Sequence, residues 1–217
     1  MSEAGEDKAG FNELNALLRE KGSFWHRTSL LGLKGILTAN ALQPNAGSFG
    51  YSYPQSKSSY ASALKAVALF DFDEPTDDAI ADRTYAWEPF IFGKLPGVLI
   101  RLDRAALDKS LLILPSEIWA NDYRLSPLQD RAKLTIIPDM EALYIGPISA
   151  GAFSRLILLD HGGGGNYRFE QFNVSAAERL VQLGAQWAAE HEAEEKTRRE
   201  AGELSLADLT MEIAKGS

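Results

Sequence analysis

The 217-residue chain contains no cysteine, which excludes disulfide bonds and metal sites built from thiolates. The absence of cysteine also fits a reducing compartment. No apolar run approaches the roughly 20 residues that a membrane-spanning helix needs. Residues 1–8 are mostly acidic and small, and they lack the basic-then-apolar pattern of a signal peptide. We therefore expect a cytoplasmic protein without a membrane partner.

Histidine is scarce as well, with three residues at positions 26, 161 and 191. No two of them have the His-x3-His spacing of a zinc site, so we expect no bound metal. His161 precedes the glycines at 162–165, but the Lys-Ser/Thr ending of a phosphate-binding loop is absent. That glycine run is more typical of a hinge.

Positive charge is in deficit, with 22 Lys and Arg against 30 Asp and Glu and a net charge of −8. This balance argues against broad electrostatic attraction to nucleic acid. The acidity is mostly terminal, because residues 1–9 carry −2, residues 190–203 carry −3 and residues 204–217 carry −1. Residues 10–189 are left at about −2, so a local basic groove on the body of the protein remains open.

The composition, 45% hydrophobic and 24% charged, is typical of one globular domain with appendages. We expect a disordered N-terminus at 1–10, a domain at 11–174, and a C-terminal helix and tail at 175–217. In the last segment Leu180, Leu183 and Trp187 recur at near-helical spacing. The first half of that long helix should therefore pack on the domain, and its charged second half should be solvated.

Hydrophobic periodicity predicts short strands interleaved with small helices, which is an α+β arrangement. Helices are expected at 11–21, at 30–38 with Thr28 or Ser29 as the cap, at about 60–65, after Asp103 and around 150–153. Strands are expected at 24–28, 66–72, 89–92, 97–103, 111–114, 142–148 and 155–159. Residues 73–78 are expected to form an acidic turn.

A loop at 43–57 is rich in Gly, Ser and Pro and carries Phe49, Tyr51 and Tyr53. Loops longer than about 12–15 residues in a compact domain are usually functional or disordered. Three aromatic residues favour the functional interpretation, because disordered linkers rarely carry them. We expect this loop to act as a mobile lid over a ligand.

One histidine stands at a strand-to-helix junction, in Phe24-Trp25-His26-Arg27-Thr28, and is followed by an apolar helix face of Leu30, Leu33, Ile36 and Leu37. This spacing resembles the opening motif of the DarT-type ADP-ribosyltransferase toxins. It resembles more loosely the wider family that includes poly-ADP-ribose polymerases and RNA 2′-phosphotransferases. In that family a strand carries a histidine, a hydroxyl residue follows two positions later, and a helix packs behind. The resemblance implies that His26 and Thr28 bind NAD⁺.

A second segment, Asp139-Met140-Glu141-Ala142-Leu143-Tyr144-Ile145-Gly146-Pro147-Ile148, is similar to the late part of the same family. There the catalytic glutamate begins a strand that leads through a corner and a small helix into a final edge strand. Glu141 occupies the matching place, and residues 153–157 match the final strand. The resemblance, which covers about residues 24–160, implies that Glu141 is the catalytic carboxylate.

The middle of the family pattern places an aromatic or small hydroxyl residue, and in the DarT type an arginine, between the first helix and the next core strand. Tyr60 is our choice for the aromatic residue that stacks on nicotinamide, with Tyr51 and Tyr53 as rivals. No arginine occurs between Arg27 and Arg83. Lys57 is the substitute for the arginine that meets the NAD⁺ phosphates, although it acts only as a point charge.

These residue types suit cleavage of the bond between nicotinamide and ribose, which gives the sugar oxocarbenium character. A carboxylate beside the ribose stabilises that charge, as it does in glycosidases. A histidine can hydrogen-bond ribose hydroxyls, and an aromatic ring stacks on the cationic nicotinamide. The resemblance also implies an ADP-ribosyltransferase-like fold, with two small packed sheets around an NAD cleft and peripheral helices.

The expected activity is transfer of ADP-ribose from NAD⁺ to a macromolecule, in a bacterial toxin or phage-defence setting with an antitoxin-like partner. The nearest resemblance favours DNA or RNA as the acceptor, whereas the acidic balance keeps a protein acceptor open. NAD⁺ hydrolysis or RNA 2′-phosphate removal on the same fold is an alternative, and so is a non-catalytic binding protein.

Overall fold

The computed structural model describes residues 10–44, 58–92, 95–119, 134–137, 139–161 and 167–200. The expected terminal segments, 1–10 and the tail beyond 200, lie almost entirely outside these residues. The strands are β1 (Ser23–Ser29), β2 (Ala41–Leu42), β3 (Ala66–Phe70), β4 (Gly97–Asp103), β5 (Leu112–Ile113), β6 (Glu141–Ile145), β7 (Ile148–Ser149), β8 (Phe153–His161) and β9 (Tyr167–Phe172). The α-helices are α1 (Phe11–Leu18), α2 (Leu30–Ala39), α3 (Tyr60–Leu64), α4 (Asp77–Asp82), α5 (Thr84–Phe92), α6 (Pro115–Trp119) and α7 (Ala177–Glu200).

Seven strands form one sheet in the order β5-β6-β3-β1-β4-β8-β9, in which all neighbours are antiparallel. The expected α+β class is confirmed. In place of the two small packed sheets that we expected, the described residues form this large sheet and a separate two-stranded sheet, in which β2 pairs with β7. Near its centre, the seven-stranded sheet has few paired residues between two neighbouring strands. β1 pairs with β4 along its whole length, from Ser23 to Ser29, whereas β1 and β3 meet at the single pair Trp25 and Phe70.

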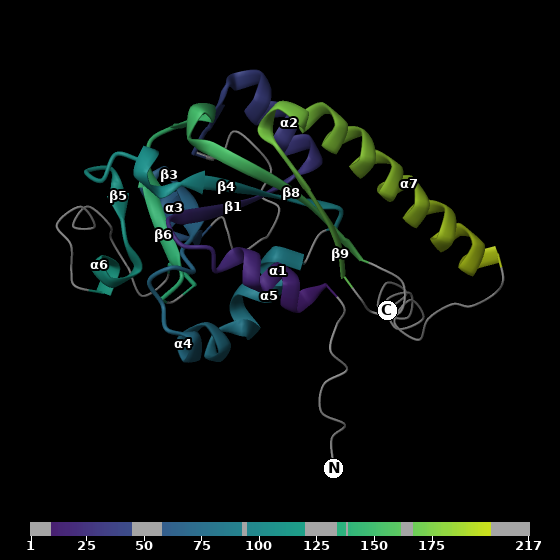
Figure 1. Cartoon of the computed structure of the whole chain (residues 1–217). Helices are drawn as coiled ribbons and strands as arrows, with labels where there is room; N and C mark the ends of the chain where they lie inside the picture. Colours follow the sequence, from purple (N-terminus) through teal and green to yellow (C-terminus); the bar gives the residue numbers. More distant parts are fainter. Residues whose placement is uncertain are drawn as a thin grey trace, which may run out of the picture.

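Helices cover both faces of this sheet (Figure 1). Because successive residues of a strand point to opposite faces, one strand contributes to two cores. On β1, Phe24 packs in the core shared with α2 and α7, whereas Trp25 packs in the core shared with α1, α4 and α5. The Trp25 indole also donates a hydrogen bond to the carbonyl oxygen of Leu18 in α1, at 2.9 Å. A third, smaller core joins α3 to β6.

The junction between β1 and α2 follows from two neighbouring residues. The hydroxyl of Ser29 accepts a hydrogen bond from the Gly32 amide at 3.0 Å, which confirms one of the two expected caps. A Cβ at Gly32 would lie 2.2 Å from the Thr28 hydroxyl oxygen, so a larger residue at this position would force the Thr28 side chain to move. The helix ends at Asn40, whose φ of 50° is left-handed.

Several sequence-based assignments are wrong. The strand expected at 89–92 is the end of helix α5, which tolerates Pro89. The acidic turn expected at 73–78 is shorter, because helix α4 already begins at Asp77. The hydroxyl of Thr76 caps this helix by accepting a hydrogen bond from the Ala79 amide. The strand expected at 142–148 is broken by Gly146, whose φ of 98° separates β6 from β7. Strand β9 was not expected.

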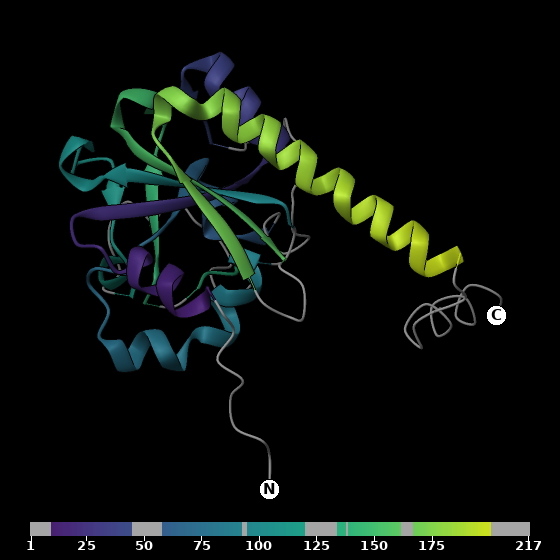
Figure 2. The same cartoon turned by 45° about the vertical axis from the view of Figure 1, so that its right-hand side comes forward.

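Helix α7 packs by its first half and extends past the sheet with its second (Figure 2), as the sequence predicted. Leu180 and Trp187 are buried, and a Cβ at Gly184 would lie 2.5 Å from a Leu30 methyl carbon. Residues 192–197 are all exposed. Among the residues described, no helix is both long enough and apolar enough to cross a membrane.

Candidate active site

Glu141 is the first residue of β6, and its side chain folds back on the turn that precedes the strand. Its carboxylate accepts a hydrogen bond from the Ile137 amide at 2.9 Å, while its own amide donates to the Ile137 carbonyl at 3.0 Å. The turn passes through Asp139, whose φ of 63° is left-handed. Glu141 therefore has a local structural role, because it closes the 137–141 turn from both its side chain and its backbone.

Burial raises the pKa of Glu141 to about 7, and the hydrogen bond from Ile137 opposes this shift only in part. The residue is 8% exposed. Among the described residues no basic group forms an ion pair with it. Carboxyl groups with such perturbed pKa values are common at functional sites, where a substrate or neighbour supplies the missing charge. The structure thus holds a buried carboxyl whose pKa lies near neutrality.

His26 lies in the middle of β1, and its ring reaches across to the neighbouring strand β3. Its Nδ1 is 2.9 Å from the carbonyl oxygen of Ala68. A carbonyl oxygen can only accept, so Nδ1 carries the proton and donates it. Burial lowers the pKa of His26 to about 4, with a further lowering by Arg27, so the ring is neutral at pH 7. The Nε2 of this tautomer is a hydrogen-bond acceptor, which can accept a hydrogen bond from a ribose hydroxyl.

Strand register places His26 and Glu141 on either side of β3. Glu141 pairs with Phe70, which in turn pairs with Trp25, the neighbour of His26. Side chains alternate along a strand, so Glu141 is on the same sheet face as Trp25 and Phe70, whereas His26 is on the opposite face. Strand β3 therefore lies between the two residues, and their side chains are on opposite faces of the sheet.

Thr28 is on the same sheet face as His26, but its side chain packs against helix α2. Its hydroxyl lies against Gly32 in the first turn of α2, as the 2.2 Å approach to a Cβ built there indicates. The side chain is half-buried. The structure therefore explains Thr28 by the strand-to-helix junction, and its expected contact with NAD⁺ stays a prediction.

Tyr60 begins α3 and is also mainly a packing residue. It is 7% exposed and belongs to the core cluster that includes Ile113 and Leu143. Its amide donates to the Thr135 carbonyl at 3.1 Å, and Ser59 caps the helix that it starts. Tyr60 lies on the Glu141 side of the sheet, because Leu143 follows Glu141 by two residues on the same strand. Little of its ring is available to stack on nicotinamide.

The other expected contacts with NAD⁺ lie outside the described residues. They are Tyr51 and Lys57, together with the rival Tyr53. The lid predicted at 43–57 falls outside them too, apart from residues 43 and 44.

Sequence reasoning missed Arg83, which lies between α4 and α5. Its guanidinium forms an ion pair with Asp139 at 3.2 Å and so reaches the turn that leads into Glu141. The Nε atom of Arg83 is buried and has no hydrogen-bond partner among the described residues. No local signal in the sequence could have revealed this, because positions 83 and 139 are joined only by the fold.

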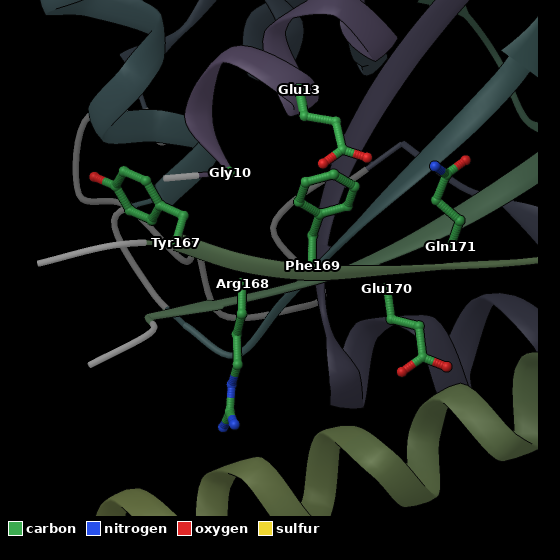
Figure 3. A pocket seen from close by; sticks show the side chains of 7 residues that line it. All are labelled: Gly10, Glu13, Tyr167, Arg168, Phe169, Glu170 and Gln171. Atoms are coloured by element: carbon green, nitrogen blue, oxygen red, sulfur yellow. The ribbon is translucent and has the colours of Figure 1, made fainter. Parts of the chain in front are cut away.

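One hollow of about 420 Å³ lies elsewhere, between the start of α1 and β9 (Figure 3). It includes none of the residues expected to bind NAD⁺, and β9 is the far edge of the sheet from β5 and β6. In the part of the chain that the structure describes, no cluster of three or more His, Asp or Glu residues is suited to hold a metal ion. The His26 and Glu141 side chains beside β3 are thus separate from the hollow beside β9.

A comparison with models of known protein families finds no match, and a comparison with curated proteins finds none either.

Proposed function

We propose that the protein transfers ADP-ribose from NAD⁺ to a macromolecular acceptor. The observation that carries this proposal is the buried carboxyl of Glu141, whose pKa is raised to about 7 by burial. A nearby positive charge favours the ionised form of such a group. NAD⁺ brings this charge on its nicotinamide ring, and the ribose acquires it as the nicotinamide leaves. The substrate would therefore ionise the carboxylate that stabilises the developing cation.

His26 contributes the second half of the proposed site. Because its Nδ1 is held by Ala68, its Nε2 can accept a hydrogen bond from a hydroxyl of the nicotinamide ribose. Both residues flank β3 from opposite faces, so NAD⁺ would have to lie where β1 and β3 separate and reach past the edge of β3. This placement is the strictest geometrical requirement of the proposal.

Arg83 is a basic residue that the fold brings to the Glu141 turn, and we assign it the phosphate-binding role that the resemblance implied for Lys57. Its Asp139 partner is 43% exposed, so a phosphate could compete for the guanidinium at modest cost. A guanidinium also offers the bidentate geometry that phosphate favours.

The acceptor and setting follow from the family resemblance rather than from the site. DNA or RNA is the first candidate because of the resemblance, and protein is the second because a net charge of −8 disfavours broad attraction to nucleic acid. A toxin or phage-defence effector would need an inhibitory, antitoxin-like partner to protect the cell that makes it.

The experiment is incubation of the full chain with NAD⁺ labelled in its adenine moiety, in separate pools of DNA, RNA and protein. Label in one pool together with released nicotinamide supports transfer and identifies the acceptor class. Released nicotinamide with label only in free ADP-ribose would replace transfer by NAD⁺ hydrolysis, the second candidate, which uses the same Glu141 and His26. No nicotinamide release from any pool would contradict both and favour a binding protein, an interpretation that fits the packing roles of Thr28 and Tyr60.

A further inference from the structure

Strand β9 forms one edge of the seven-stranded sheet. It pairs with β8 through six residues, from Tyr167 opposite His161 to Phe172 opposite Leu156. Among the described residues no strand pairs with its other side. The outer side of an edge strand is a template on which another strand can form backbone hydrogen bonds.

The hollow in Figure 3 follows this edge. Five consecutive β9 residues line it, from Tyr167 to Gln171, together with Gly10 and Glu13. Consecutive strand residues point to opposite faces, so a hollow that touches all five must run along the strand rather than lie over one face. Tyr167, Phe169 and Gln171 point toward α1, whereas Arg168 and Glu170 point toward α7 (Figure 3). The shape therefore suits an extended chain laid beside β9.

The α1 side of the hollow carries two aromatic rings, those of Tyr167 and Phe169, and is closed at one end. The Tyr167 ring stacks on Phe92 with centroids 4.0 Å apart, and Phe169 packs at the margin of the same core. At Gly10 a Cβ would lie 2.5 Å from the Tyr167 carbonyl oxygen, so the start of α1 rests directly on that end of the strand. An occupant would begin beyond this contact and could place an apolar side chain over Phe169.

The charge that lines the hollow is negative. Arg168 would usually deter strand pairing, but its guanidinium is turned to the α7 side, where it binds Asp160 at 2.7 Å and Glu190 at 2.9 Å. Its guanidinium carbon also lies 4.2 Å from the centre of the Trp187 ring. Glu170 is half-buried and lies 4.0 Å from the guanidinium of Arg179, whereas Glu13 on the α1 side is an exposed acid of the hollow.

We propose that the β9 edge binds an extended, basic segment of another protein as an added antiparallel or parallel strand. Backbone hydrogen bonds to β9 would give affinity, and alternate side chains would meet Phe169 and Glu13. A second copy of this chain fits less well. Two β9 strands paired about Phe169 would bring the two Glu13 residues together on the same face, without a free basic partner.

The test uses the full chain and a six-residue, end-capped peptide of alternating Lys and Val, followed by ¹⁵N amide spectra. We expect saturable shifts confined to β9 and the start of α1. A peptide of alternating Glu and Val should bind more weakly. A Lys-Val peptide methylated on alternate backbone nitrogens should lose binding, because it keeps its charge but not its amide donors.

Glu13→Lys should weaken binding of the Lys-Val peptide by about five-fold, the scale of a reversed surface charge. Glu178→Lys, an exposed charge reversal on α7, is the matched control and should leave binding unchanged. Equal binding by the methylated peptide would overturn strand addition, and absence of any shift would overturn the site. Concentration-dependent dimers in analytical ultracentrifugation, abolished by Phe169→Lys, would assign the edge to a second copy instead. None of these readouts depends on NAD⁺, so this proposal and the proposed function can fail separately.

Discussion

His26 donates its Nδ1 proton to the carbonyl oxygen of Ala68 at 2.9 Å, at the place where β1 and β3 separate. Side-chain-to-backbone bonding here replaces the strand pairing that stops at Trp25 and Phe70. It also fixes which ring nitrogen carries the proton. The same hydrogen bond therefore connects β1 to β3, where strand pairing is sparse, and sets the tautomer of the histidine that the family resemblance singles out.

This geometry predicts the titration of His26. Burial lowers its pKa to about 4, so the ring should stay neutral, with its proton on Nδ1, from pH 7 down to about pH 5. Long-range ¹H–¹⁵N spectra of the histidine rings give both the tautomer and the pKa. A His26 that titrates near the ordinary value of 6.5, or that carries its proton on Nε2, would contradict the bond to Ala68.

His26→Ala should weaken NAD⁺ binding by about five-fold, because a hydrogen bond to a ribose hydroxyl contributes roughly 1 kcal/mol. Isothermal titration calorimetry of both proteins measures this. Thr28→Ser is the matched control, since it keeps the hydroxyl that faces Gly32 on the same strand. If His26→Ala bound NAD⁺ as tightly as the natural chain, the role of His26 would be limited to joining β1 and β3.

Glu141 should make the protein less stable as pH rises. Its pKa is about 7 in the folded chain and about 4.5 in the unfolded chain, so between these values the unfolded state binds fewer protons. Its stabilising contribution is complete below pH 4.5 and is lost by pH 7. Relative to the natural chain, Glu141→Gln should therefore gain up to about 3 kcal/mol between pH 4 and pH 8. Urea unfolding of both proteins at several pH values tests this, and parallel pH profiles would show that the Glu141 pKa is unshifted.

The two halves of α7 should differ in their effect on stability. Removing residues 193–217 takes away a segment whose described side chains, at 193–197, are all exposed, and it should shift the melting temperature by less than about 3 °C. Ending the chain at Gln186 removes buried Trp187 and the partners Glu190 and His191, which bind Arg168 and Asp160. Loss of a buried tryptophan costs about 3–5 kcal/mol, so a fall of about 10 °C is expected. Equal melting temperatures for the two truncations would refute this division of α7.

Much of the fold was readable from local pattern. The apolar face of 30–37 with Ser29 before it gave α2 and its cap, and the apolar run at 97–103 gave β4. The sequence-based assignments were wrong where tertiary contacts outweigh the local preference of the residues for helix or strand. Residues 89–92 are apolar and include a proline, yet they continue α5 because Ile91 and Phe92 are buried against the sheet. β9 alternates polar and aromatic residues, but it follows a glycine run, and only pairing with β8 makes it a strand.

The candidate site was only partly predictable. The sequence identified Glu141 at a strand start, but it could not show that the carboxylate would close a turn onto Ile137. It could not show that Tyr60 is buried, or that Arg83 reaches Asp139. Each of these depends on contacts between distant segments, for which one sequence holds no local signal.

The central claim is that Glu141 supplies the charge for cleavage of NAD⁺, and Glu141→Gln tests it most directly. A glutamine side-chain oxygen can still accept the Ile137 amide, so the 137–141 turn is kept and only the charge is lost. Glu117→Gln is the matched control, because the Glu117 carboxylate likewise accepts a backbone amide, that of Leu114, at 2.6 Å. Nicotinamide release from NAD⁺ by the natural chain should fall by about 10²–10³-fold in Glu141→Gln and stay within about two-fold in Glu117→Gln. Release by Glu141→Gln at the rate of the natural chain would contradict the account.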